Sequence, residues 1–370
     1  MNIVFCGGGT VGHITPAIAI AEEFKKTHPD AKIAFIGRKG GYENEVIKKN
    51  GYELFEIEIS GLIRKFTLRN LKVIKNAISA ERRSKEFLKS FDADAVIGTG
   101  GYVCFPVIRS ASRLGIFTAV HESNVTMGLT SRLLAKKCDI LLLGAKTEAS
   151  SKKRIYTGNP IRAEFYSAKK DTARRILGIP RNVFFIFSVG GSIGSGKLNE
   201  SCIEMIERFS ENDRRVLHSH VCGKRYFEEI KKTKSELFSK KTKSSVIPFT
   251  DKMHLYLSAS DVVISRCGAM TLSEISASGT ASILIPSPNV TADHQTKNAM
   301  YFVENGASVL IKECDLSHTA LIDAVKDLLE NPTKLNKMSM NARALASPNA
   351  SKDIVKAIEK RVFVPKNEKL

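Results

Sequence analysis

The stretch CGGGTVGHITPAIAIAEEF, residues 6–24, follows the short apolar run MNIVF at the start of the chain. Gly7, Gly9 and Gly12 have the spacing G-x-G-x-x-G, which is typical of a tight turn between a strand and a helix in dinucleotide-binding proteins. A strand, a glycine loop and a helix in this order predict an α/β fold built on a parallel sheet. The stretch also predicts an anion site, because backbone N–H groups point outward at a helix N-terminus and the helix dipole favours negative charge.

The residues after this loop have the pattern of a helix and its N-terminus. Thr15 is an acceptable cap, and Pro16 suits the first turn of a helix. A single apolar stripe follows at helical spacing, formed by Ile14, Ala17, Ile18, Ala21 and Phe24. A dinucleotide site needs one more element, an acid at the end of the next strand that binds the ribose hydroxyls. That strand ends in Gly37 and Arg38, so the acid is missing and an NAD(P) site is disfavoured.

Short apolar runs alternate with helical patterns along all 370 residues, as in parallel sheets covered on both faces. The length favours two domains. A second strand–glycine loop–helix series starts near residue 183, and the turn at 157–160 separates the two series. The last expected helix, 351–362, has no strand after it and is expected to pack on the first unit. The expected strands are 2–6, 32–37, 54–59, 95–98, 117–121, 140–143, 183–189, 216–221, 261–265, 282–285 and 308–311.

Two further glycine loops follow expected strands. The loop at 190–198, GGSIGSGKL, nearly matches the phosphate-binding pattern G-x-x-x-x-G-K-[ST], but Leu198 stands where the Mg²⁺-binding hydroxyl is required. The loop GTGGY, residues 98–102, lies at the carboxyl end of its strand, where open α/β sheets bind ligands. A tight strand–helix turn explains any one such loop, whereas three of them indicate a cleft that binds phosphates.

Composition restricts the class of partner and of chemistry. The net charge of +19 indicates an anionic partner, although a Lys-rich proteome is an alternative explanation. Nucleic acid is disfavoured as a partner, because no recognised nucleic-acid-binding motif is present and the chain has no Trp.

The seven Cys lack C-x-x-C spacing and favour buried free thiols in a reducing compartment. No secretory signal or membrane span is expected. Asp92 and Asp94 precede their strand and are expected to be solvated acids, and no other spacing predicts a metal site.

Polar residues cluster at the ends of expected strands. His13 opens a helix, where its neutral form is favoured and suits a general base. His121, Glu122 and Asn124 end another strand. In the second half, Glu274 lies one to two turns into a helix, where its carboxylate can accept two hydrogen bonds from a ribose diol. The segment 293–298 follows the next strand and its loop.

The order of these motifs resembles the MurG family of peptidoglycan synthesis, the N-acetylglucosaminyltransferases that convert lipid I to lipid II. The matching segments are GGGTVGHITPAIAIA, IGTGGYVCFPV, HESNVTMGLTSRLLA, TGNPIR, VGGSIGSGKLNE, SRCGAMTLSE and DHQTKNA. The resemblance implies a GT-B fold, in which two Rossmann-like domains face each other across a cleft. It implies an acceptor- and membrane-facing domain at 1–160, joined by a C-terminal helix at about 346–370, and a domain at 161–345 that binds UDP-N-acetylglucosamine.

The activity implied is inverting transfer of N-acetylglucosamine from UDP-N-acetylglucosamine to the muramyl 4-hydroxyl of lipid I, without a metal or other cofactor. His13 best matches the acid/base of the family, with His121 and Glu122 as the other candidates. Gly100, Gly101 and Tyr102 resemble the loop for the acceptor diphosphate. The expected contacts to UDP-N-acetylglucosamine are Thr10, Val11, Gly12, Asn124, Arg162, Ser192, Thr250, Ala269, Met270, Thr271, Leu272, Ser273, Glu274, Gln295 and Asn298.

Two positions depart from the family pattern. The first loop has Val11 where the family commonly has Gly, and the second-domain loop has Ile193 where it commonly has Gln. Other UDP-sugar transferases and a UDP-N-acetylglucosamine epimerase share the GT-B fold and stay open as alternatives. Gly61 to Phe91 carries nine Lys or Arg against two Glu, interleaved with apolar residues. This basic stretch is expected to lie on anionic lipid at the cytoplasmic face of the plasma membrane, where lipid I and cell-wall synthesis proteins would be its partners.

Overall fold

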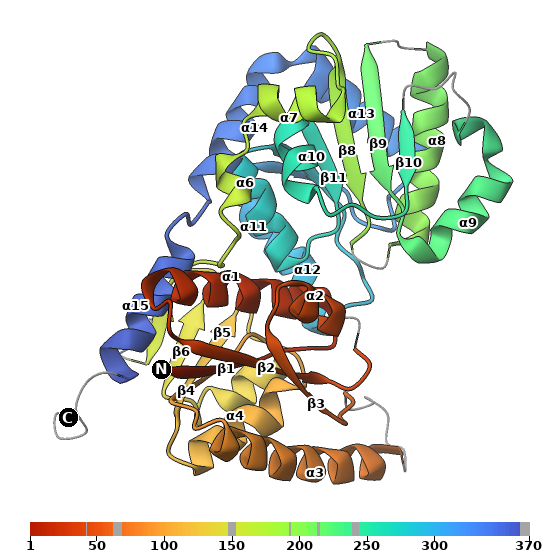
Figure 1. Ribbon diagram of the computed structural model, residues 1–370. Helices are drawn as coiled ribbons and strands as arrows, with labels where there is room; N and C mark the ends of the chain where they lie inside the picture. Colours follow the sequence, from red (N-terminus) through yellow and green to blue (C-terminus); the bar gives the residue numbers. More distant parts are fainter. Residues whose placement is uncertain are drawn as a thin grey trace. The chain divides into compact units, whose positions relative to one another are not determined.

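The computed structural model describes residues 1–41, 43–61, 69–146, 153–191, 194–212, 215–238 and 244–362 (Figure 1). The chain forms two compact units. The first unit comprises Met1–Ile161 together with Ser347–Leu370, and the second comprises Arg162–Ala346. Val11 and residues 69–72 belong to helices whose backbone alone is described.

The first unit is built on a seven-stranded parallel sheet in the order β3-β2-β1-β4-β5-β6-β7. Its strands are β1 Asn2–Cys6, β2 Lys32–Arg38, β3 Glu53–Ile57, β4 Ala95–Gly98, β5 Phe117–Glu122, β6 Ile140–Leu143 and β7 Arg154–Tyr156. Its helices are α1 Val11–Thr27, α2 Glu43–Lys49, α3 Arg69–Ser90, α4 Cys104–Arg113, α5 Leu129–Leu134 and α15 Ala350–Val362.

Helices cover both faces of this sheet, with α1 and α2 on one side and α3 and α4 on the other (Figure 1). Ile354, Val355 and Ile358 of α15 are buried in the same core cluster as Ile14 and Ile18 of α1. The last helix therefore returns to the first unit. The other face has its own buried cluster, which includes Val4, Val96 and Val107.

The second unit has a six-stranded parallel sheet in the order β10-β9-β8-β11-β12-β13. Its strands are β8 Phe184–Val189, β9 Val216–Val221, β10 Ser245–Ile247, β11 Val262–Ser265, β12 Ala281–Leu284 and β13 Ser308–Leu310. Its helices are α6 Glu164–Ser167, α7 Lys170–Leu177, α8 Gly196–Asn212, α9 Lys224–Thr233, α10 Met253–Ala259, α11 Ala269–Ser278, α12 His294–Glu304, α13 His318–Glu330 and α14 Pro332–Ala344, with short 3-10 turns Ser235–Phe238 and Thr291–Asp293.

The α/β class and the strands expected from the sequence are confirmed, with ends that shift by one or two residues. Two strands were missed, β7 and β10. Both have three residues and lie at a sheet edge, too short to produce an apolar run. All seven cysteines are free, and only Cys314 is exposed.

The predicted start of the first helix is wrong. Helix α1 begins at Val11, so Thr15 lies inside it and is not its cap, and Pro16 lies beyond the first turn. Proline there leaves the carbonyl of Gly12 without its usual helical donor. The N-cap is Thr10, which has an extended backbone and makes no side-chain capping bond. The glycine loop passes directly into the helix, which propensity rules did not indicate.

Candidate active-site groups in the two units

Two glycine loops of the first unit meet at His13. A Cβ on Gly100 would lie 2.7 Å from Cδ2 of the His13 ring, and a Cβ on Gly101 would overlap the carbonyl oxygen of Gly8. Both glycines have positive φ, +114° and +80°, which side chains rarely adopt. The hydroxyl of Thr99 donates to the backbone carbonyl of His13 at 2.6 Å. The loops after β1 and β4 are thus fitted to each other, and glycine is required where they touch.

The imidazole of His13 is held in one tautomer. Its Nδ1 lies 3.1 Å from the carbonyl oxygen of Gly8 and 3.3 Å from the hydroxyl of Thr10. Because a carbonyl oxygen only accepts hydrogen bonds, Nδ1 carries the proton and Nε2 keeps its lone pair. Burial lowers the pKa of His13, while the Gly8 contact and the carboxylates of Glu122 and Glu43 oppose that shift. The ring is therefore neutral at pH 7, in the form that accepts a proton.

Glu43 and Tyr102 complete the surroundings of this loop. The buried carboxylate of Glu43 accepts a hydrogen bond from the backbone N–H of Gly9 at 3.0 Å. Gly9 has φ +93°, and a Cβ there would lie 2.8 Å from the Tyr102 ring. Sequence patterns did not single out Glu43, because it lies on α2, distant in sequence from the loop that it supports.

His121 and Glu122 have different surroundings from His13. His121 is fully buried, and its Nε2 donates to the carbonyl of Gly158 at 3.2 Å. Glu122 accepts from the backbone N–H and the side-chain amide of Asn124 and from the N–H of Gly128, at 2.8–3.0 Å. These contacts shape the loop after β5 and orient Asn124. Of the three acid/base candidates, His13 has the nitrogen lone pair available for substrate.

In the second unit, the loop between β8 and α8 requires glycine for a steric reason. Gly194 has φ +78°, and a Cβ there would overlap the carbonyl oxygen of Cys222 at the end of β9. Gly191 has φ +89°, with open space where its Cβ would stand. Ser192 and Ile193 lie outside the described residues.

Helix α11 starts at the carboxyl end of β11 and carries Glu274. Gly268 is its N-cap, so the first N–H groups of the helix are exposed at the strand ends. Burial raises the pKa of Glu274 to about 7, opposed by the charge of Arg162 and reinforced by Glu164. Arg162 pairs with Glu164 at 2.8 Å.

The other predicted contacts on α11 differ in exposure. The side chains of Met270 and Leu272 are buried in the unit, so these two residues offer backbone groups to a ligand. Ala269, Thr271 and Ser273 are partly exposed.

Two predicted contacts on α12 anchor the segment before α11. Gln295 Oε1 accepts from the backbone N–H groups of Cys267 and Ser287 at 3.1 and 2.9 Å. The Asn298 amide donates to the carbonyl of Cys267 at 3.2 Å.

Ala292 and Asp293, just before α12, both have positive φ. This conformation costs free energy and often marks a functional segment. No sequence signal indicated this strained pair. Thr250 Oγ1 accepts from the N–H of Lys252 at 3.1 Å in the turn before α10.

Arg266 is a further residue that sequence reasoning did not assign. Its guanidinium contacts Ser195 before α8 and Glu313 after β13. It also donates to the carbonyls of Ile285 and Pro286 after β12, both at 3.3 Å. One buried side chain thus ties together the loops at four strand ends. An arginine directly after an apolar strand is the only sequence signal that could have found it.

Asp92 and Asp94 lie at the opposite end of their strand from His13. The carboxylate of Asp94 accepts from the backbone N–H of Asn2 at 2.8 Å, and the Asn2 amide donates to the carbonyl of Asp92 at 3.0 Å. Both residues are exposed, as expected for solvated acids, and their contacts hold the start of β1.

Two parallel-sheet α/β units with glycine loops at the carboxyl ends of their strands have the architecture of the GT-B fold. Residues 3–142 match the glycosyltransferase family 28 N-terminal domain, and residues 185–358 match its C-terminal domain. A Thermoanaerobacter protein named UDP-N-acetylglucosamine–N-acetylmuramyl-(pentapeptide) pyrophosphoryl-undecaprenol N-acetylglucosamine transferase is 39% identical over 97% of this chain and 99% of its own. The chain therefore belongs to family 28 and, within it, to the family of these transferases, which use UDP-N-acetylglucosamine.

Solved structures agree with this assignment. The crystal structure of Acinetobacter baumannii MurG is 25% identical, with a TM-score of 0.75 over 97% of this chain and 99% of that one. A UDP-GlcNAc 2-epimerase from Neisseria meningitidis has a TM-score of 0.68 over 98% of this chain and 100% of that one. At 16% identity, the epimerase shows a shared fold only. The family assignment decides against a dinucleotide site in the first loop.

Proposed function

We propose that this protein transfers N-acetylglucosamine from UDP-N-acetylglucosamine to the muramyl 4-hydroxyl of lipid I, with inversion, to give lipid II. The observation that carries this function is the match to relatives of that activity over 97% of the chain. The residue roles below rest on the geometry within each unit.

The second unit binds the donor. The helices that follow Gly191 and Gly268 direct backbone N–H groups toward the strand ends, where they stabilise the diphosphate and the departing UDP without a metal. Glu274, one turn and a half into α11, accepts hydrogen bonds from the ribose diol. Arg162 supplies a positive charge near that carboxylate. Gln295 and Asn298 hold the segment before α11, so they act by positioning its N–H groups.

The first unit supplies the base. The bare Nε2 of His13 takes the proton of the muramyl 4-hydroxyl as the oxygen attacks the anomeric carbon. Nδ1–H donates to Gly8 and stabilises the imidazolium that forms. Gly100 and Gly101 lie against the His13 ring and Tyr102 lies against Gly9, and the acceptor diphosphate binds at this loop. Thr10, Gly12 and Asn124 contact the sugar of the donor.

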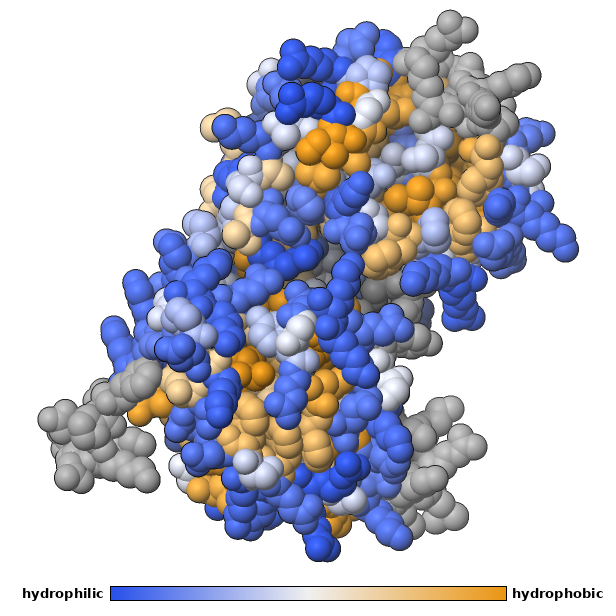
Figure 2. Space-filling model, in the orientation of Figure 1, coloured by the Kyte–Doolittle hydropathy of each residue, from blue (hydrophilic) through white to orange (hydrophobic). Residues whose placement is uncertain are grey.

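The acceptor is a lipid, and helix α3 is the surface proposed to lie on the membrane at its cytoplasmic face. Ile74 and Ile78 are one turn apart and exposed by 51% and 66%. Lys75, Arg82 and Lys85 are exposed on the same helix, and the surface along α3 is mostly hydrophilic with scattered hydrophobic residues (Figure 2). Residues 62–68 of the basic stretch lie outside the described residues. Among the described residues, no helix is long and apolar enough to cross a membrane.

Product analysis distinguishes transfer from epimerisation. UDP-N-acetylglucosamine is incubated with the protein, with and without a lipid I analogue, and the products are identified by mass spectrometry. Transfer predicts UDP and a disaccharide-linked lipid only when the analogue is present. A UDP-sugar epimer formed without acceptor would overturn the proposed function.

A further inference from the structure

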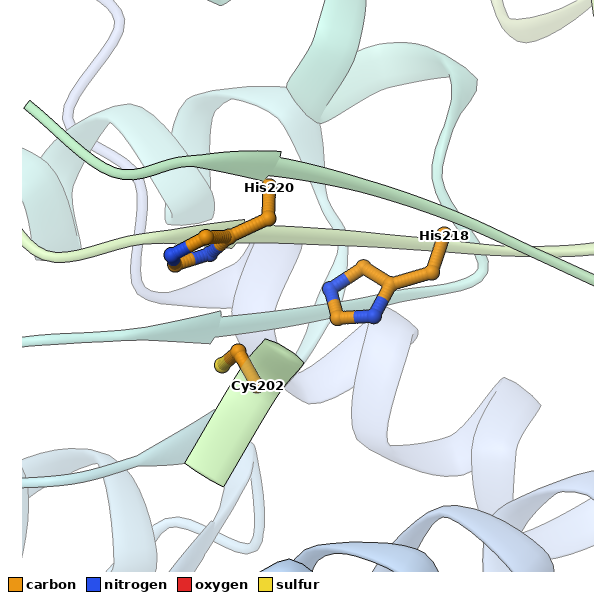
Figure 3. A group of neighbouring side chains, drawn as sticks. All are labelled: Cys202, His218 and His220. Carbon is orange, nitrogen blue, oxygen red and sulfur yellow. The ribbon is translucent and has the colours of Figure 1, made fainter. Parts of the chain in front are cut away.

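A group of side chains able to bind a metal lies inside the second unit, between α8 and its sheet. Cys202 belongs to α8, and His218 and His220 belong to β9. The sulfur and one nitrogen of each imidazole all lie within 4.8 Å of one another. The three side chains are fully buried. Figure 3 shows both imidazoles on one side of β9, with Cys202 nearby on α8.

The fold brings these residues together by register. Alternate residues of a strand share a face, so His218 and His220 project in the same direction. Ser188 of β8 pairs with His220 across the sheet. Cys202 is on the buried side of α8, in the core cluster that contains Ile186 and Ile264. Three metal-binding side chains therefore occupy a face that is otherwise apolar, where polar groups require a compensating interaction.

Hydrogen bonds fix the proton positions of this cluster. The Asn199 amide donates to the carbonyl of Cys222 at 2.9 Å, so its oxygen accepts from Nε2–H of His220 at 3.0 Å. Nδ1 of His220 is therefore bare and accepts the hydroxyl proton of Ser188 at 2.6 Å. The Ser188 oxygen in turn accepts from Nε2–H of His218 at 2.6 Å. Nδ1 of His218 is buried and has no hydrogen-bond partner among the described residues.

Burial makes the charged forms of these groups unfavourable. All three side chains are fully buried, where their neutral forms are favoured. Without a metal, the cluster holds two neutral imidazoles and a thiol. Neutral imidazole is the form that binds metals, and the thiol becomes a ligand when a cation displaces its proton.

We propose that Cys202, His218 and His220 bind one Zn²⁺ ion, with the Ser188 hydroxyl at the fourth position. Nitrogen and thiolate ligands in a buried cluster favour zinc. The Cys202 proton leaves to solvent, and the Nε2 proton of His218 moves to its unpartnered Nδ1. Asn199 accepts a hydrogen bond from Nε2–H of His220, the nitrogen that does not face the metal. Histidine ligands of zinc usually donate their other ring N–H to a protein acceptor in this way. Ligand atoms in a tetrahedral site lie about 3.3–3.7 Å apart, so zinc binding requires the three side chains, now within 4.8 Å, to adjust and the Ser188 hydroxyl to move away from the two nitrogens that lie 2.6 Å from it.

This zinc is structural and takes no part in glycosyl transfer. All its protein ligands are buried, and the ion links α8 to β8 and β9. The loop between β8 and α8 leads directly into the helix that carries Cys202. Zinc therefore fixes the helix whose N-terminus is proposed to bind the donor, but zinc binding itself does not depend on that proposed role.

Metal analysis of the full chain tests the site. The protein is purified from zinc-supplemented medium, and metals are measured by inductively coupled plasma mass spectrometry. We expect about one zinc per chain. Cys202→Ser and His220→Gln should lose most of it, whereas Cys314→Ser, which changes the exposed cysteine outside the cluster, should retain it. Equal zinc in Cys202→Ser and Cys314→Ser would overturn the proposed ligands.

A second measurement does not depend on the variants folding. Zinc is removed from the unmodified protein by a chelator, and Co²⁺ is added. A tetrahedral site with a thiolate predicts a sulfur-to-cobalt charge-transfer band, visible d–d bands and a higher Tm, all reversed by added zinc. Less than about a tenth of an equivalent of zinc together with no cobalt spectrum would show that the cluster is only a hydrogen-bonded network.

Discussion

Nδ1 of His13 lies 3.1 Å from the carbonyl oxygen of Gly8, three residues before α1 begins at Val11. The contact fixes the proton on Nδ1 and leaves Nε2 as a base. The same glycine loop that resembles a dinucleotide fingerprint therefore serves to orient a histidine. Close packing requires two of the fingerprint glycines, because a Cβ on Gly7 would lie 2.9 Å from the carbonyl oxygen of His13 and a Cβ on Gly9 would lie 2.8 Å from the Tyr102 ring.

Replacing His13 by Ala should lower kcat by about two to four orders of magnitude, which is the usual effect of losing a general base. KM for the donor should change little, because the imidazole is proposed to act on the acceptor hydroxyl. Steady-state kinetics with a lipid I analogue measures both. His28→Gln, at the other end of α1, is the matched control. Near-normal turnover in His13→Ala would remove His13 from the base role.

The acidic limb of the pH profile should also report His13. Its pKa is lowered below 6.5 by burial, and the base is active when deprotonated. We therefore expect kcat at saturating donor, which does not report the ionisation of Glu274 in the free protein, to be flat above pH 6.5 and to fall only at lower pH. The residual activity of His13→Ala should lack this limb. An unchanged limb in the variant would assign it to another group.

Replacing Glu274 by Gln should raise KM for UDP-N-acetylglucosamine by about 10- to 100-fold, because two charge-assisted hydrogen bonds to the ribose become weaker. Turnover at saturating donor should change much less. Glu304→Gln, an exposed position at the end of α12, provides the control. If both variants have the same donor KM as the unmodified chain, Glu274 does not contact the ribose.

The raised pKa of Glu274 also predicts how stability depends on pH. Folding favours the protonated carboxyl, whose pKa rises from 4.5 to about 7. Its contribution to the free energy of unfolding is complete below pH 4.5 and is lost as pH rises through about 7. The glutamine of Glu274→Gln cannot ionise. The Tm of the variant minus the Tm of the unmodified protein should therefore increase between pH 5 and pH 8. Thermal unfolding without ligand measures this difference, and a constant difference would contradict the burial of this carboxyl.

Sedimentation with vesicles tests the membrane surface. Lys75→Glu/Lys85→Glu should reduce binding to anionic vesicles at low salt, because each basic residue near the surface contributes about 1 kcal/mol. Lys326→Glu/Lys337→Glu makes the same charge change at exposed positions on α13 and α14 and should bind like the unmodified chain. Equal loss in both variants would indicate an effect of net charge rather than of α3.

Much of the fold was predictable, because strands buried on both faces appear as continuous apolar runs and glycine loops mark their carboxyl ends. His13 could be predicted because it follows one of these glycine loops. Glu43 and Arg266 could not be predicted, because each contacts loops that are distant from it in sequence. The Cys202–His218–His220 cluster was missed because 15 residues lie between Cys202 and His218, and only the packing of α8 against β9 brings them together. Tertiary contacts of this kind leave no local pattern.

The most direct test of the account is release of UDP from UDP-N-acetylglucosamine, measured with and without a lipid I analogue. The account predicts rapid, stoichiometric UDP release that requires the analogue and needs no added metal. His13→Ala should slow this release by about two to four orders of magnitude. Equal UDP release with and without the analogue would contradict transfer to lipid I.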